Sequence, residues 1–241
     1  MEIKNELLAD HISQQFNADL EDLRNRLLSM GGLVEKQVTE AIEALISADS
    51  ELALSVCEQD ADVNFMEIAI DQECSRILAR RQPAASDLRL VLACTKAATD
   101  LERVGDEAAK IARFAIKLSE QGEAPKGYIE TRHIGNRVRQ MIHDALDAFA
   151  RFDAEQALEV AKEDKSVDRE YKSATRELVT YMMEDPRSIT RVLNIMWVLR
   201  SLERIGDHAR NISEYVIYLV KGTDVRHIGL KRMQEEVFNK Q

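Results

Sequence analysis

Two near-identical acidic hexapeptides carry the side chains in this sequence that are best suited to chemistry. Leu101–Asp106 reads LERVGD and Leu202–Asp207 reads LERIGD, so the two copies differ only in Val against Ile. In a helix, the Glu and the Asp of each copy lie four residues apart and point from one face. Two such carboxylates repel each other and are costly to bury unless they stay in solvent, pair with Arg or Lys, or bind a metal ion. Clusters of carboxylate oxygens suit hard cations such as magnesium and manganese, and they also hold iron.

A second pair of polar positions with the same spacing precedes each hexapeptide. Asp164 and Asp168 lie four residues apart, and their counterparts in the first half are Asp60 and Asn64. If the helices that carry them are antiparallel neighbours of the hexapeptide helices, each half could form one cation site. The candidate metal ligands are therefore Glu102, Asp106, Glu203, Asp207, Asp164, Asp168, Asp60 and Asn64. Because Asn64 replaces a carboxylate, the first-half site is expected to be weaker or different in charge.

Other kinds of site have little support in the residues, and we assign no catalytic residue. The five histidines form no paired Glu-x-x-His arrangement of the di-iron type, and no glycine-rich phosphate loop is present. His208 is interpreted as a helix-surface imidazole rather than as an accessory ligand. Glu67 and Asp71 also lie four residues apart, but their counterparts in the second half are not acidic, so we interpret them as a solvated face.

Long helices must position these side chains. Only 9 Gly and 3 Pro interrupt 241 residues of which 45% are hydrophobic, a composition that favours helices and can bury a core. Periodicity and capping residues predict helices over about 6–47, 50–80, 86–119, 128–151, 154–183 and 188–222. The expected first residues or caps are Asp49 or Ser50, Ser86–Asp87, Asp153 and Ser188.

The sequence repeats well beyond the hexapeptide. Gly31 matches Gly135 and Val63 matches Val167 at an offset of 104 positions, whereas Glu102 matches Glu203 at an offset of 101. The change in offset falls in a turn, where a deletion is tolerated. We therefore predict an all-α fold of two tandem three-helix bundles related by internal duplication. The first bundle covers 1–120, a linker covers 121–127, the second bundle covers 128–222, and a tail expected to be loosely attached covers 223–241.

Charge and hydropathy restrict the function further. A net charge of −10 and a pI near 5.1 argue against a nucleic-acid partner. The first residues show no basic end followed by an apolar run, so we expect no secretory signal, and no uninterrupted apolar run is long enough to span a bilayer. Membrane association is therefore expected only through partners. Three widely separated cysteines indicate reduced thiols, and we expect a cytoplasmic protein.

The residues also resemble a known family. The duplicated hexapeptide, the opening His11–Asn17 (HISQQFN) and Arg81–Arg89 (RQPAASDLR) are similar to the PhoU family over nearly the whole chain. The resemblance implies two three-helix bundles and homodimers. It also implies negative regulation of phosphate uptake and of the phosphate-starvation response. In that role the chain would be a non-catalytic adaptor between a Pst-type phosphate ABC transporter and a PhoR-like sensor histidine kinase.

Family resemblance further implies metal clusters, of iron or zinc among others, held by Glu/Asp-x-x-x-Asp motifs. These map onto Glu102 with Asp106 and onto Glu203 with Asp207, while Asp164 with Asp168 fits the spacing and Asp60 with Asn64 departs from it. Two alternatives remain open at this point. One is a metal-dependent helical-bundle enzyme, an oxidase or a phosphohydrolase. The other is a metal-free scaffold in which Arg103 or Arg204 partners the acids.

Overall fold

The computed structural model describes residues 14–120 and 128–239, and these residues form helices and no strand. Six of the helices are long, as the hydrophobic periodicity predicts, and the all-α prediction is confirmed. They are α2 (Gln14–Ser47), α3 (Ser50–Arg81), α4 (Ala85–Ser119), α5 (Tyr128–Arg151), α6 (Ala154–Glu184) and α7 (Ile189–Lys221). A short 3-10 turn η1 (Pro186–Ser188) precedes α7, and a short helix α8 (Leu230–Phe238) follows it.

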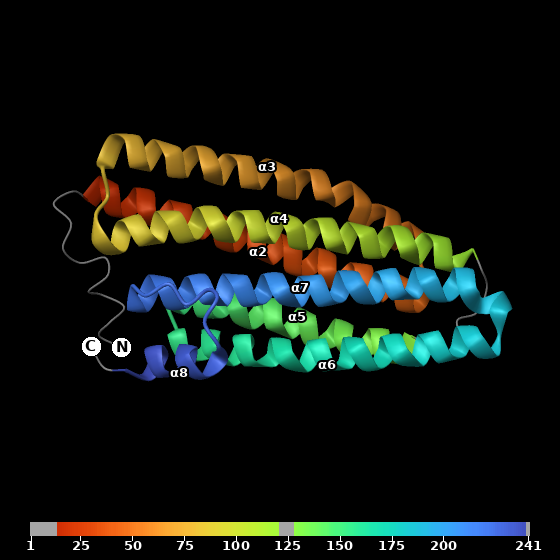
Figure 1. Cartoon of the computed structure of the whole chain (residues 1–241). Coiled ribbons are helices and arrows are strands. Elements are labelled where there is room, and N and C mark those ends of the chain that lie inside the picture. Colours follow the sequence, from red (N-terminus) through yellow and green to blue (C-terminus); the bar gives the residue numbers. More distant parts are fainter. Residues whose placement is uncertain (1–13, 121–127, 240–241) are drawn as a thin grey trace.

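The long helices pack as two three-helix bundles that lie side by side. Helices α2, α3 and α4 contact one another, as do α5, α6 and α7, and the two groups meet mainly along α4 with α7 and also along α2 with α5. Figure 1 shows α4 and α7 running along each other through the middle of the molecule, with α3 and α6 on opposite outer sides. A continuous cluster of buried apolar side chains extends through both bundles. The third helix of each half, which carries the acidic hexapeptide, is therefore the central one.

Equivalent turns begin the middle helix of each half. Ala48 and Phe152 adopt left-handed backbone angles, with φ of 56° and 54°, and an aspartate follows each of them. Asp49 and Asp153 both accept hydrogen bonds of 3.0 Å from the backbone N–H groups two and three residues later. These caps satisfy donors that a helix start leaves without partners. The sequence repeat is thus reproduced in the backbone and in its capping.

The first helix of each half crosses its counterpart at a glycine. A Cβ placed on Gly31 of α2 would lie 2.8 Å from Leu146 Cδ1 of α5, and one placed on Gly135 of α5 would lie 3.0 Å from Ile42 Cδ1 of α2. Leu146 and Ile42 are themselves counterparts in the repeat. The close approach of α2 and α5 therefore has approximate two-fold symmetry, and each glycine accommodates the same position of the other half.

Two segments differ from the sequence-based expectation. The start of α4 has no side-chain cap, because Ala84 occupies the cap position and Asp87 lies buried in the first turn, so the predicted Ser86–Asp87 cap is wrong. The segment after α7 contains α8, whose Met233 and Val237 are buried and which contacts α6. Among the described residues, no helix has the length and apolar character that a bilayer crossing requires.

Candidate acidic sites

The first acidic cluster lies between α3 and α4. Glu102 and Asp106 project from α4, and Asp60 projects from the neighbouring α3 with all three side chains half-buried. Burial, reinforced by the negative charge of Asp106, raises the pKa of both Asp60 and Glu102 above the usual carboxyl range. A Cβ placed on Gly105, the residue before Asp106, would lie 3.6 Å from Asp60 Oδ1, so the structure brings together side chains that the sequence repeat only aligned.

Oxygen atoms in this first cluster lack partners. The Oδ1 atoms of Asp60 and Asn64 are both buried without a hydrogen bond. Within the described chain, Asp60, Glu102 and Asp106 form no ion pair, although Lys110 and Arg113 are near enough to lower the pKa of Asp60 partially. A buried oxygen without a donor is costly, because it has lost water and gained nothing in exchange. The cluster therefore has the composition of a cation site, because it contains unpaired carboxylate and amide oxygens and a negative charge that a bound cation would neutralise.

The second acidic cluster lies between α6 and α7 and differs in how its charge is balanced. Asp164 and Asp168 of α6 lie beside Glu203 and Asp207 of α7, and burial followed by repulsion from Asp207 raises the pKa of Glu203. Burial also raises the pKa of Asp207, as does the nearby charge of Asp168. The Oε2 atom of Glu203 is buried without a hydrogen bond. All four predicted ligands of the second half thus lie in one region.

Arginines compensate this second cluster. Arg200 Nη1 lies 2.7 Å from Glu203 Oε1, and Arg210 Nη1 lies 3.2 Å from Asp164 Oδ2. Both arginines line a groove of about 420 Å³ along α7. The metal-free alternative named Arg103 or Arg204 as the partner, and the structure does not pair either of them with these acids: Arg204 binds Glu107 at 2.5 Å and Arg103 is exposed. Charge compensation by arginine is therefore real in the second half but uses different residues.

The acids are near one another without forming a finished metal site. In the described part of the chain, no three His, Cys, Asp or Glu side chains are arranged so that they could hold a metal ion as they stand. Cation binding would need side-chain rotation or additional oxygen ligands. The residues present fit a hard cation in charge and in donor type, because they offer carboxylate and amide oxygens.

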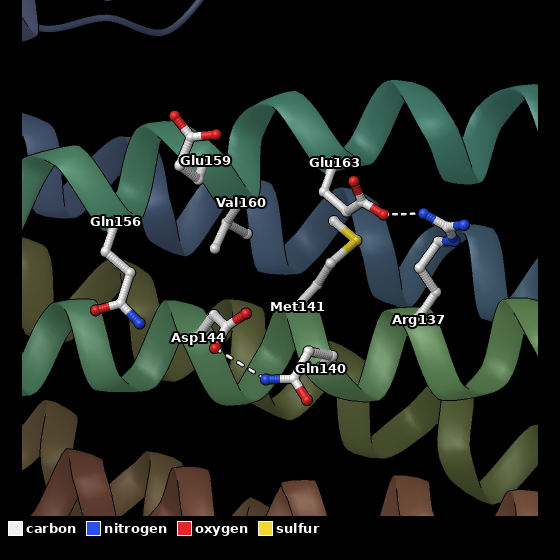
Figure 2. A pocket seen from close by; sticks show the side chains of 8 residues that line it. All are labelled: Arg137, Gln140, Met141, Asp144, Gln156, Glu159, Val160 and Glu163. Atoms are coloured by element: carbon white, nitrogen blue, oxygen red, sulfur yellow. Dashed lines mark hydrogen bonds and ion pairs between the residues drawn. The ribbon is translucent and has the colours of Figure 1, made fainter.

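A further hollow of about 340 Å³ lies between α5 and α6 of the second half, and none of the four candidate ligands of the second cluster lines it. Figure 2 shows Arg137 of α5 paired with Glu163 of α6, and Gln140 bonded to Asp144 along α5. Its charged side chains already have partners, so it offers no converging unpaired groups to a ligand.

A buried polar group that the sequence did not reveal joins the two bundles. His208 is 7% exposed and donates from Nδ1 to Asp100 Oδ1 at 2.7 Å, so its interpretation as a helix-surface imidazole is wrong. Tyr215 and Asn211 also donate to the Asp100 carboxylate, at 2.7 and 3.1 Å. Burial raises the pKa of Asp100, but these three hydrogen bonds outweigh it and hold the pKa below the usual range.

Glu67 likewise differs from the solvated group that the sequence predicted, since it is half-buried and accepts a hydrogen bond from the Thr99 hydroxyl at 3.1 Å.

These features define an internally duplicated helical-bundle protein with an acidic cluster on each half. The PhoU domain model matches residues 27–115 and 131–216, that is, once in each bundle. The chain belongs to the PhoU family.

Individual relatives agree with this assignment. A Pseudomonas aeruginosa protein described as a phosphate-specific transport system accessory protein PhoU homolog is 69% identical over 237 residues, covering 98% of each chain. The Escherichia coli K12 PhoU is 50% identical, covering 92% of each chain. The crystal structure of PhoU from Pseudomonas aeruginosa is 69% identical to this chain and superposes with a TM-score of 0.85, and the match covers 86% of this chain and 100% of that one. The crystal structure of the phosphate transport system regulatory protein PhoU from Streptococcus pneumoniae is 32% identical and superposes with a TM-score of 0.81, and the match covers 87% of this chain and 99% of that one. The family is one of non-catalytic accessory and regulatory proteins, so the alternative of a metal-dependent enzyme is set aside.

Proposed function

We propose that this chain is a negative regulator of phosphate uptake and of the phosphate-starvation response. It acts as a non-catalytic adaptor between a Pst-type phosphate ABC transporter and a PhoR-like sensor histidine kinase. The observation that carries the proposal is 69% identity over 98% of the chain to a phosphate-specific transport system accessory protein. In this role the protein works in the cytoplasm and reaches the membrane only through its partners.

The surface of α7 supports association of the chain with a second copy of itself. Ile189, Leu193 and Trp197 follow one another at four-residue steps and are 43%, 45% and 59% exposed, so they form an apolar stripe on one helix face. Exposed apolar side chains grouped in this way are typical of protein-binding surfaces. We assign this stripe to homodimer formation. Sedimentation equilibrium that gives the mass of a single chain at micromolar concentration would contradict the assignment.

The acidic clusters supply the metal component of the proposal. Divalent or multinuclear metal ions, of iron, zinc, manganese or magnesium, neutralise carboxylates that otherwise repel one another, and thereby stabilise the bundles or a contact with a partner. What supports this is the raised carboxyl pKa values and the unpaired buried oxygens of both clusters. Protein that carries no metal by elemental mass spectrometry, and gains no thermal stability from added Mg²⁺, Mn²⁺, Fe²⁺ or Zn²⁺, would contradict it.

Complementation tests the regulatory function. A Pseudomonas aeruginosa strain without its own PhoU homolog, carrying a reporter of phosphate-starvation genes, is expected to regain repression in high phosphate when it expresses this chain. The double variant Trp197→Glu, Leu193→Glu is expected to restore less repression, because charges on the apolar stripe oppose association. Asp71→Asn on the exposed face of α3 is the matched control and should complement fully. Reporter activity that stays high with the wild-type chain, despite normal expression, would exclude the proposal.

A further inference from the structure

The interior of the first bundle contains an amide without partners. Gln37 of α2 is 0% exposed, and neither its Nε2 nor its Oε1 makes a hydrogen bond. Buried polar side chains in folded proteins nearly always bond to protein, to water or to a ligand, because an unpaired amide is costly. An unpaired glutamine with no exposed surface therefore calls for a partner that lies inside the bundle.

Gly105 connects this amide to the first acidic cluster. A Cβ placed on Gly105 would lie 3.2 Å from Gln37 Oε1, 3.3 Å from Val63 Cγ1 and 3.6 Å from Asp60 Oδ1, which is the buried carboxylate oxygen without a partner. Any larger residue at this position of α4 would fill the space between the two oxygens. The glycine within the hexapeptide thus leaves an opening in which the amide oxygen of α2 and the carboxylate of α3 face one point.

In the second bundle a methionine replaces the amide, while the neighbouring valine, Val63 or Val167, is common to both halves. Met141 occupies the position that corresponds to Gln37, and a Cβ on Gly206 would lie 3.5 Å from Val167 Cγ1 and 3.8 Å from Met141 Cε. Met141 is buried and extends from α5 towards α6 (Figure 2). The two halves therefore differ at one position of the first helix: the side chain beside the hexapeptide glycine is a polar amide in the first bundle and an apolar thioether in the second.

The donors available in the first bundle are oxygens. Cys57 lies one turn before Asp60, but its thiol donates to the carbonyl oxygen of Ala109 at 3.7 Å, and burial raises its pKa. A protonated thiol is a poor metal ligand. Amide and carboxylate oxygens without soft ligands favour cations of the Mg²⁺ and Mn²⁺ class.

We propose that Gln37 supplies an interior amide oxygen to a divalent, oxygen-preferring cation held by the first acidic cluster. The inference rests on the proposed metal binding and adds a ligand from α2 to acids on α3 and α4. It makes the two halves inequivalent. The first half offers a cation site that reaches the core, whereas arginines and apolar side chains occupy the corresponding region of the second.

The test compares Gln37→Met with the wild-type chain, using Mn²⁺ as the probe. Methionine has a similar volume and is the residue that the second half places there. The variant is expected to bind Mn²⁺ about tenfold or more weakly in titrations followed by electron paramagnetic resonance of free Mn²⁺. Its melting temperature in chelator should equal or exceed that of the wild type, because the unpaired amide is gone, while the gain on adding Mn²⁺ should shrink.

Controls separate the possible outcomes. Met141→Leu, a change at the equivalent position of the second half, should leave Mn²⁺ affinity unchanged. Gln37→Glu, which adds a charge, should bind Mn²⁺ more tightly and melt lower without metal.

Equal Mn²⁺ affinity in Gln37→Met and wild type would overturn the inference while leaving the metal part of the proposed function intact. A lower metal-free melting temperature with an unchanged gain from Mn²⁺ would also overturn it, since that result describes an amide held by buried water. Absence of Mn²⁺ binding by the wild type would instead remove the metal proposal itself.

Discussion

Asp100 and its three hydrogen-bond donors show which features of a single residue the sequence pattern predicts and which it does not. The helical spacing of His208, Asn211 and Tyr215 was readable in the sequence and places them near one face of α7. Their common acceptor lies on α4, more than a hundred residues earlier, and only the packing of the two bundles brings it to them. In contrast, Glu102 and Asp106 were predicted as candidate ligands because both recur in the repeat, and they remain candidates in the structure. A repeated motif identifies residues that occur in both halves, whereas Asp100 has no acidic counterpart in the second half and so could not be identified in this way.

Replacement of Asp100 should therefore weaken the connection between the bundles. In Asp100→Ala, the buried imidazole of His208 and the half-buried Tyr215 hydroxyl and Asn211 amide lose their acceptor. We expect the free energy of unfolding to fall by about 2–4 kcal/mol. Urea denaturation followed by circular dichroism measures the change. Asp71→Ala, at an exposed position of α3, is the control and should stay within about 0.5 kcal/mol of wild type. Equal stability of Asp100→Ala and the control would show that this hydrogen-bonded group does not hold the bundles together.

At the scale of helices, the periodicity and caps predicted six long helices with nearly the observed bounds wherever the structure describes them, because an amphipathic helix repeats its apolar residues with a fixed period. The predicted first turns of the first helix, residues 6–13, lie outside the described residues. The Asp49 and Asp153 caps were likewise predictable, since each combines a capping residue with the repeat. The start of α4 was not, because Ser86 and Asp87 resemble a cap but lie inside the first turn. The crossing of α2 with α5 depends on glycines at matched positions of the repeat, but only the packing shows that these two helices meet there.

Adjacent glycines in α2 provide an internal comparison for this crossing. Gly31 faces Leu146, whereas a Cβ on Gly32 would have nothing within 4 Å. Gly31→Leu is expected to destabilise the protein by about 1–3 kcal/mol, because the added side chain must displace a packed helix. Gly32→Leu should instead be neutral or stabilising by up to about 1 kcal/mol, since leucine is the better helix former. Thermal melts of both variants measure the contrast, and equal effects at the two positions would rule out a tight crossing at Gly31.

At the scale of the whole molecule, the acidic clusters add to an unfavourable charge balance. The chain carries a net charge of −10, and the carboxyl groups with raised pKa values lie on its two central helices and their neighbours. An acid whose folded-state pKa is raised binds its proton more tightly in the folded state than in the unfolded one. Its contribution to stability is therefore present below the ordinary carboxyl pKa of about 4 and is lost as pH rises through the raised value.

Neutral variants of the second cluster isolate this effect. With chelator present, the melting temperature of Glu203→Gln, Asp207→Asn should exceed that of wild type by a margin that grows from pH 4 to pH 7, because only the wild type ionises there. Asp19 is expected to show the opposite pH dependence, because its pKa is lowered rather than raised. Its carboxylate is buried, but Arg81 at 2.9 Å and Gln15 outweigh burial and lower its pKa. Asp19→Asn should therefore melt below wild type at pH 7, and the deficit should vanish as pH falls through that lowered pKa. A pH-independent difference for the cluster variant would mean that Arg200 and Arg210 already balance these acids fully, and that no cation is needed in the second half.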